Sequence, residues 1–163
     1  MNGALARLAA EAPLPEPLCL AFGLACVSRI EHLLQDARAM AGLDALRRFV
    51  AGTLETSTLR AAAAELQQIA NRHRGSNTID GGAHAAVSAT YAVANALAGR
   101  ALAAADYAAY AAVYAYGAYA VGDPGAFEPE FAWQVEQWKA LAVRAAGGED
   151  GVAAAPGAAG CPG

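Results

Sequence analysis

The sequence predicts an all-α fold: a single-domain, alanine-rich bundle of five to six helices. Of the 163 residues, 56% are hydrophobic while only 7% are aromatic, because alanine supplies most of the apolar positions. Alanine has the highest helix propensity and gives up no side-chain entropy in a helix. The larger apolar residues recur at three- and four-residue steps, which places them on one face of a helix.

The bundle is expected to occupy residues 1–146 as one domain, the usual number for a chain of this length. Residues 147–163 read GGEDGVAAAPGAAGCPG and lack helical periodicity. Their glycine, alanine and proline content cannot support a packed core, so we expect a disordered C-terminal tail.

A proline-rich break separates the first two helices. A short helix is expected over 2–11 with Asn2 as its cap, and the stretch APLPEPL at 12–18 ends it. Proline has no N–H to donate, so the next helix can begin with Pro17 in its first turn.

This second helix is predicted to run from about 17 to 40 and to end at Gly42. Its apolar stripe consists of Cys19, Phe22, Cys26, Ile30, Leu33 and Ala37. On the polar face, His32 and Asp36 would lie one turn apart, a spacing that can hold one edge of a metal site. A solvated surface pair is the better interpretation.

Turn residues divide the rest of the chain into five further helices. The expected ranges are 43–52, 58–75 with Ser57 or Thr58 as cap, 83–101 with Asp80 as cap, 103–122, and 130–146 after the break DPGAFEPE.

Charge and composition exclude several classes of protein. The net charge is −4 and there is no run of Lys or Arg, so nucleic-acid binding is not expected. The stretch LCLAFGLACVS lacks the flanks of a signal peptide, and residues 81–99 are too weakly apolar to predict a membrane span. Three cysteines without a disulfide framework indicate a reducing cytoplasm.

No catalytic motif stands out, so the sequence predicts no catalytic, cofactor-binding or metal-binding residue, and it favours a non-enzyme while leaving a small enzyme open. The patterns G-x-x-x-x-G-K-[ST], G-x-S-x-G and H-E-x-x-H are absent. Cys26 is best interpreted as a small buried hydrophobe. His73 suits the C-terminal end of a helix, and His84 is interpreted as a first-turn surface residue, with anion binding as the alternative.

Five of the six tyrosines lie in YAAYAAVYAYGAYAVGD, residues 107–123. At about 100° per residue, Tyr107, Tyr110 and Tyr114 share one side of a helix, and Tyr116 and Tyr119 lie on the other. We interpret them as core side chains whose hydroxyl groups need hydrogen-bond partners. A ligand pocket and a protein interface remain open as alternatives.

Three stretches together resemble the immunity-5-like family of bacterial immunity proteins, over about residues 18–143. They are CLAFGLACVSRI, the short helix ending in FVAG, and EFAWQVEQWKAL, which contains Trp133 and Gln134. Typical members carry histidines in the fourth long helix, whereas SATYAVANALAG has none after His84. The resemblance implies a small, non-enzymatic protein that protects its producer by binding a toxin.

Three functions therefore compete. The first is an immunity-type protein, monomer or homodimer, whose negative surface suits a basic protein partner. The second is a small-molecule binder or small enzyme with a pocket between the helices at 83–101, 103–122 and 130–146. The third is a self-assembling helical scaffold. The candidate partner or ligand face comprises His84, Tyr91, Tyr107, Tyr110, Tyr114, Tyr116, Tyr119, Trp133 and Gln134.

Overall fold

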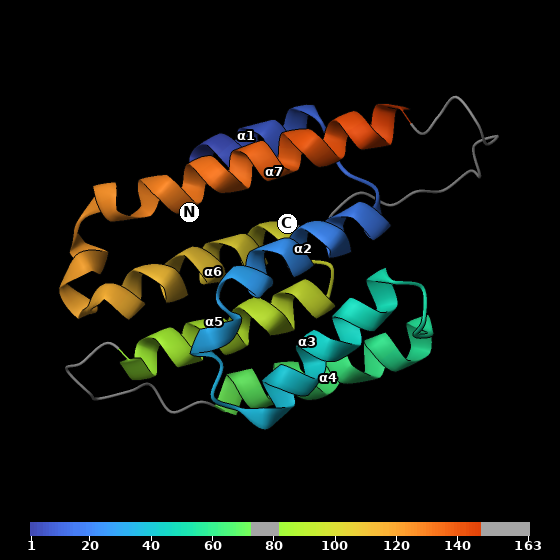
Figure 1. The fold of residues 1–163 in the computed structure, drawn as a ribbon, viewed down its shortest axis with the longest axis horizontal. Coiled ribbons are helices and arrows are strands. Elements are labelled where there is room, and N and C mark those ends of the chain that lie inside the picture. The colour runs from blue at the N-terminus through green and yellow to red at the C-terminus, as the bar shows by residue number, and fades with distance from the viewer. Residues whose placement is uncertain (73–81, 148–163) are drawn as a thin grey trace.

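The computed structural model describes residues 1–72 and 82–147, and this part of the chain is all-α, as predicted (Figure 1). It contains seven α-helices: α1 Gly3–Glu11, α2 Glu16–Arg29, α3 Ala37–Val50, α4 Thr56–Arg72, α5 Gly82–Leu97, α6 Ala101–Tyr116 and α7 Glu128–Gly147. Three 3₁₀ turns connect them: η1 Glu31–Leu33, η2 Ala118–Gly122 and η3 Pro124–Phe127. No helix in these ranges is both long and apolar enough to cross a bilayer.

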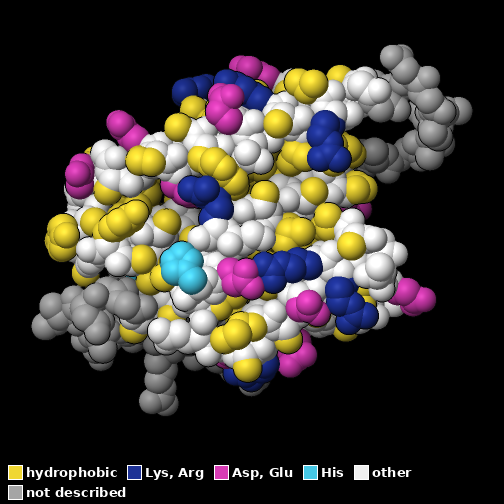
Figure 2. Space-filling view, viewed as in Figure 1, with side chains coloured by type: hydrophobic (Ala, Val, Ile, Leu, Met, Phe, Trp, Pro, Cys, Tyr) yellow, Lys and Arg dark blue, Asp and Glu magenta, His cyan; other side chains and the backbone are white. Residues whose placement is uncertain are grey.

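The antiparallel pair α5 and α6 lies at the centre of the bundle. α2 packs across both of these helices, α3 and α4 lie against α5, and α1 and α7 pack together on the side of α6 (Figure 1). On the face turned to the viewer in Figure 2, acidic and basic side chains lie close to one another among hydrophobic ones.

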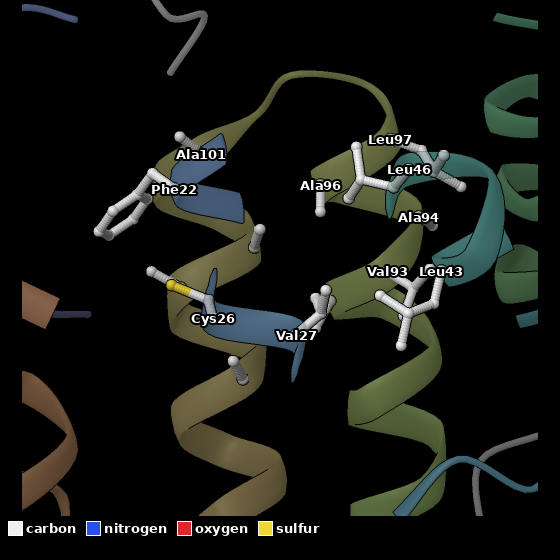
Figure 3. Packing of buried hydrophobic residues seen from close by; sticks show 14 of the residues in the cluster. Phe22, Cys26, Val27, Leu43, Leu46, Val93, Ala94, Ala96, Leu97 and Ala101 are labelled. Carbon is white, nitrogen blue, oxygen red and sulfur yellow. The ribbon is translucent and has the colours of Figure 1, made fainter. Parts of the chain in front are cut away.

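The core is built from a few large side chains set between alanine faces. Val27 of α2 points toward Val93 of α5 among buried alanines, whereas the Phe22 ring points away from α5 (Figure 3) and meets Trp138 of α7, with ring centroids 5.0 Å apart. Because alanine adds only a methyl group, neighbouring helix backbones come close together. The apolar stripe predicted for the second helix is thus confirmed at Cys19, Phe22, Cys26 and Ile30, which are buried, but is wrong at Ala37, which is exposed at the start of α3.

Glycine lets α2 approach α5 even more closely. A Cβ atom at Gly23 would lie 3.0 Å from the Cβ of Ala96 and 3.2 Å from its Cα. Contacts this short with backbone can be relieved only if the two helices move apart, so Gly23 sets their spacing.

The predicted helix over 17–40 is wrong, because the chain forms two helices joined by η1. α2 ends at Arg29, and α3 begins after Asp36, whose carboxylate accepts a hydrogen bond of 2.8 Å from the N–H of Arg38. His32 and Asp36 therefore do not share a helix. Gly42 does not end a helix but lies buried inside α3, where an added Cβ would sit 3.0 Å from Leu97 Cδ1.

Two other predicted boundaries also need correction. The helix predicted over 103–122 ends at Tyr116, because Gly117 has φ of +130°, which is incompatible with a helix. α4 begins at Thr56, so Ser57 and Thr58 lie inside it rather than capping it. The predicted cap Asp80, the histidine His73 and most of the predicted tail lie outside the described residues.

The N-terminal predictions are confirmed. Asn2 caps α1 by accepting a hydrogen bond of 3.1 Å from the N–H of Leu5. Pro17 lies in the first turn of α2, where its missing N–H costs nothing. With the short first helix included, the described residues form seven α-helices, compared with the five to six predicted.

We predict that Gly23→Leu lowers the free energy of unfolding by about 1–3 kcal/mol or more, because the side chain has to separate α2 from α5. Gly3→Leu is the control, since nothing lies within 4 Å of a Cβ at that helical position. Chemical denaturation measures both variants. Equal stabilities would contradict the close approach of α2 and α5.

We also predict that acid weakens the η1 corner. Hydrogen bonds from Arg47 and Arg38 hold the pKa values of Glu31 and Asp36 below their usual values. Carboxyl groups with a lowered folded-state pKa stabilise the fold above their unfolded pKa, and this contribution is lost as the pH falls through the folded pKa.

The free energy of unfolding should therefore decrease between about pH 5 and pH 3, around the ordinary carboxyl pKa values. The decrease should be shallower in Glu31→Gln/Asp36→Asn. Urea denaturation at a series of pH values measures this, and parallel curves for the two proteins would contradict it.

Candidate functional site

A row of stacked aromatic rings lines the outer seam between α5 and α6. His84 stacks on Tyr114 with ring centroids 5.2 Å apart, and Tyr91 stacks on Tyr107 at 5.0 Å. The two pairs are seven residues apart on each helix, so the antiparallel register places both on the same side of the hairpin. We call His84, Tyr91, Tyr107, Tyr110 and Tyr114 the aromatic ladder.

The ladder continues beyond α6 onto the segment that follows it. Tyr110 lies 6.3 Å from Tyr114 and makes an edge-to-face contact of 5.2 Å with Phe127 in η3. Phe127 in turn lies 5.5 Å from Phe131 at the start of α7. Aromatic pairs at these distances add stability beyond the area they bury. The rings therefore hold each other in a fixed arrangement.

The tyrosines are not core residues, so that interpretation of the sequence is wrong. Tyr107 and Tyr110 are 37% and 36% exposed, and Tyr116 and Tyr119 are 79% and 84% exposed. The inward side of α6 consists instead of fully buried alanines: Ala101, Ala104, Ala105, Ala108 and Ala111. The helices are too close together for tyrosine rings between them, so both tyrosine sets face outward.

Tyr116 and Tyr119 form a separate exposed tip at the end of α6. The turn between them depends on Gly117, whose φ of +130° is rarely adopted by other residues. A Cβ at Gly117 would also lie only 2.6 Å from Cε1 of Tyr119, so the ring covers the glycine. This glycine fixes where the two tyrosine side chains lie.

Trp133 does not join the ladder. The guanidinium carbon of Arg29 lies 4.2 Å from the centroid of the Trp133 ring, and the same guanidinium donates hydrogen bonds of 3.0 and 2.9 Å to Oε2 of Glu130. Glu130 is buried, so this ion pair joins the end of α2 to the start of α7. The predicted convergence of Trp133 with His84, Tyr110 and Tyr114 does not occur.

A hollow of about 370 Å³ lies beside this ion pair, between the end of α2, the end of α6 and the start of α7. Arg29, His32 and Tyr116 are among its polar lining residues, and its floor includes Ile30 and Val113. The hollow therefore differs from the pocket predicted between the helices at 83–101, 103–122 and 130–146, since its lining contains neither His84 nor Tyr110 nor Tyr114.

Gln134 is buried and belongs to a polar network rather than to an open face. Its side chain donates a hydrogen bond of 2.8 Å to the carbonyl of Ala105 and accepts one of 3.0 Å from Nδ2 of Asn2. Nδ2 of Asn2 also donates to the carbonyl of Phe131 at 3.0 Å. The network joins α1, α6 and α7, so it fixes α7 against the ladder helix.

The remaining titratable groups of the described residues do not come together in a reaction centre. Burial raises the pKa of the Cys26 thiol far above its usual value, which keeps it protonated and unreactive. Within residues 1–72 and 82–147, no three His, Cys, Asp or Glu side chains gather closely enough to hold a metal ion. Asp36 pairs with Arg38 rather than with His32.

Sequence reasoning missed Phe127, which links Tyr110 to Phe131. It lies in DPGAFEPE, which composition marks as a break, and Asp123 accepts a hydrogen bond of 2.9 Å from the N–H of Gly125 there. An Asp-Pro-Gly sequence signals an ordered turn, and that signal could have indicated that the following phenylalanine has a fixed place.

A family model described as "Imm-5 like putative immunity protein" matches residues 16–141. The match begins at the first residue of α2 and ends within α7, so it includes the whole ladder and leaves out α1. Neither the curated proteins nor the solved structures that were searched gave a match.

The Asn2 network yields a prediction. Asn2→Asp keeps a good N-cap for α1 but replaces the donor Nδ2 with an oxygen that faces the Phe131 carbonyl and Gln134 Oε1. We expect a loss of about 1–3 kcal/mol in the free energy of unfolding, the cost of buried polar groups left unpaired.

The reciprocal change, Asp36→Asn, is the matched control because Asp36 caps α3 on the surface. It retains a cap and gives up only an exposed ion pair, worth about 0–1 kcal/mol. Thermal or chemical denaturation compares the two variants, and equal losses would show that Nδ2 of Asn2 contributes nothing.

Proposed function

Because the chain belongs to the Imm-5 like family of immunity proteins, we propose that it neutralises a protein toxin by binding it directly, with the aromatic ladder as the binding face. Membership of this family indicates a protein partner in general, and the structure supplies a candidate surface for it. We propose that this toxin is made by the same cell as the immunity protein.

The observation that carries the proposal is the exposure of stacked tyrosines on the outside of a bundle whose core is alanine. Tyrosine is enriched at protein interfaces and among the residues that contribute most to binding. Its ring offers a large apolar area with few rotatable bonds, and its hydroxyl group can form hydrogen bonds at the rim. In this protein the rings do not fill the core, so folding alone does not explain them.

The ladder is also held in place before any partner arrives. Tyr107 rests on Tyr91, and Tyr110 rests on Phe127. Side chains that are already ordered lose less conformational entropy on binding. A preorganised face suits an immunity protein, which has to capture its toxin quickly and hold it.

We predict that Tyr107→Ala/Tyr110→Ala weakens binding of the cognate toxin by about 30-fold or more, since hot-spot residues contribute about 2 kcal/mol or more. Toxin candidates encoded beside this gene are co-expressed with the protein, and growth and co-purification are measured. The double variant should lose both protection and the complex.

Met40→Ala is the matched control, because Met40 is an exposed hydrophobic residue on α3 that does not belong to the ladder. A second double variant, Tyr116→Ala/Tyr119→Ala, tests the tip. Circular dichroism first establishes that each variant is folded. Full protection by a folded Tyr107→Ala/Tyr110→Ala protein would place the binding face elsewhere.

A further inference from the structure

We propose that the partner segment seated on the aromatic ladder is basic, with arginine or lysine side chains that lie on the tyrosine rings and pair with Asp123 and Glu128. This inference rests on the proposed function, since it specifies the chemistry of the partner at the same face. It follows from how charge is distributed around the rings.

The part of the chain that carries most of the ladder contains no cation. Residues 101–138 hold no Lys or Arg, although they hold five carboxylates: Asp106, Asp123, Glu128, Glu130 and Glu136. Arg100 lies at the far end of α6 from η3, and its guanidinium donates a hydrogen bond of 2.7 Å to Gln67 of α4. The segment that carries most of the ladder, together with η3, therefore has a net negative charge.

Two of the five carboxylates remain available to a partner. Glu130 pairs with Arg29, Glu136 pairs with Lys139, and Asp106 accepts a hydrogen bond of 3.1 Å from the N–H of Asn2. Asp123 and Glu128 are exposed, and neither forms an ion pair with another residue in the ranges that the structure describes.

These two carboxylates lie at the two ends of η3, next to the aromatic rings. Asp123 caps η3 by accepting the N–H of Gly125 at Oδ1, and Glu128 directly follows Phe127. The Phe127 ring contacts Tyr110 at 5.2 Å. The short turn thus carries a carboxylate residue at each end, and its Phe127 contacts the ladder at Tyr110.

Aromatic faces and carboxylates together select cationic side chains. The face of a tyrosine ring attracts a cation within about 6 Å of its centroid. A guanidinium group can stack on a ring and donate hydrogen bonds to a carboxylate at the same time, because it is planar and delocalised. An acidic partner would instead bring like charges together at a desolvating surface.

The same charges disfavour a second copy of the chain as the occupant. In a two-fold symmetric dimer the same patch meets itself, so the acidic turn and the cation-free rings of one copy would face those of the other. Asp123 and Glu128 would then gain no counter-ion across the interface.

The test uses a labelled peptide of five arginines separated by Gly-Ser, and fluorescence anisotropy measures its binding to the full chain. We expect saturable binding at 50 mM NaCl that weakens at 300 mM, where screening is stronger. Asp123→Asn/Glu128→Gln should weaken binding roughly threefold to tenfold, and Asn still caps η3. The same peptide with citrulline, which is neutral and nearly isosteric, should not bind.

The matched control is Glu11→Gln/Glu55→Gln, which removes the same net charge from exposed positions at the end of α1 and just before α4. Both positions lie at the opposite end of the bundle from η3 (Figure 1). This control should bind the arginine peptide as the wild type does. Equal losses in the two double variants would show that only net charge matters and would overturn the proposal.

Absence of arginine-peptide binding, or equal binding of the citrulline peptide, would also overturn it. Neither result bears on the proposed function. That function is tested by the protection of cells from the toxin and by the loss of protection in Tyr107→Ala/Tyr110→Ala. Conversely, if the wild-type protein binds the arginine peptide but gives no protection, the basic chemistry of the partner is supported and a toxin as the partner is contradicted.

Discussion

The close approach of α2 to α5 is the constraint on which the rest of the structure depends. A Cβ at Gly23 would lie 3.0 Å from that of Ala96, and the helices around this contact face each other through alanine. The inward side of α6 is likewise lined by fully buried alanines. The tyrosines of α6 therefore occupy its outer side, and the composition that builds the core also produces the aromatic surface.

A second constraint fixes how that surface continues. The carboxamides of Asn2 and Gln134 satisfy each other and the carbonyls of Phe131 and Ala105, so α7 is held against α6 by buried polar contacts. Arg29 and Glu130 join the start of α7 to α2 in the same way. These two sets of contacts fix the first turns of α7. Because η3 directly precedes α7, they also position η3 so that Phe127 contacts Tyr110.

The sequence was sufficient for the fold class, the Asn2 cap, the break before Pro17 and the buried stripe of α2, because these follow from local propensity and helical spacing. It was misleading at Gly42, where a glycine that looks like a helix end serves close packing against Leu97. The burial of the tyrosines could not be predicted, since it depends on the distance between helices. The stacked pairs depend on the register of α5 against α6. This register cannot be predicted from the residue spacing within a single helix.

The location of the rings also bears on how the protein would bind. Rings buried in a core would stabilise the fold and be unavailable to a partner, whereas isolated exposed rings would have to be ordered on binding. The ladder is intermediate, because each ring rests on another aromatic ring and still exposes part of its surface. Part of the entropic cost of ordering is thus met during folding. A rigid alanine core, which fixes the register of α5 and α6, makes this arrangement available to a small protein.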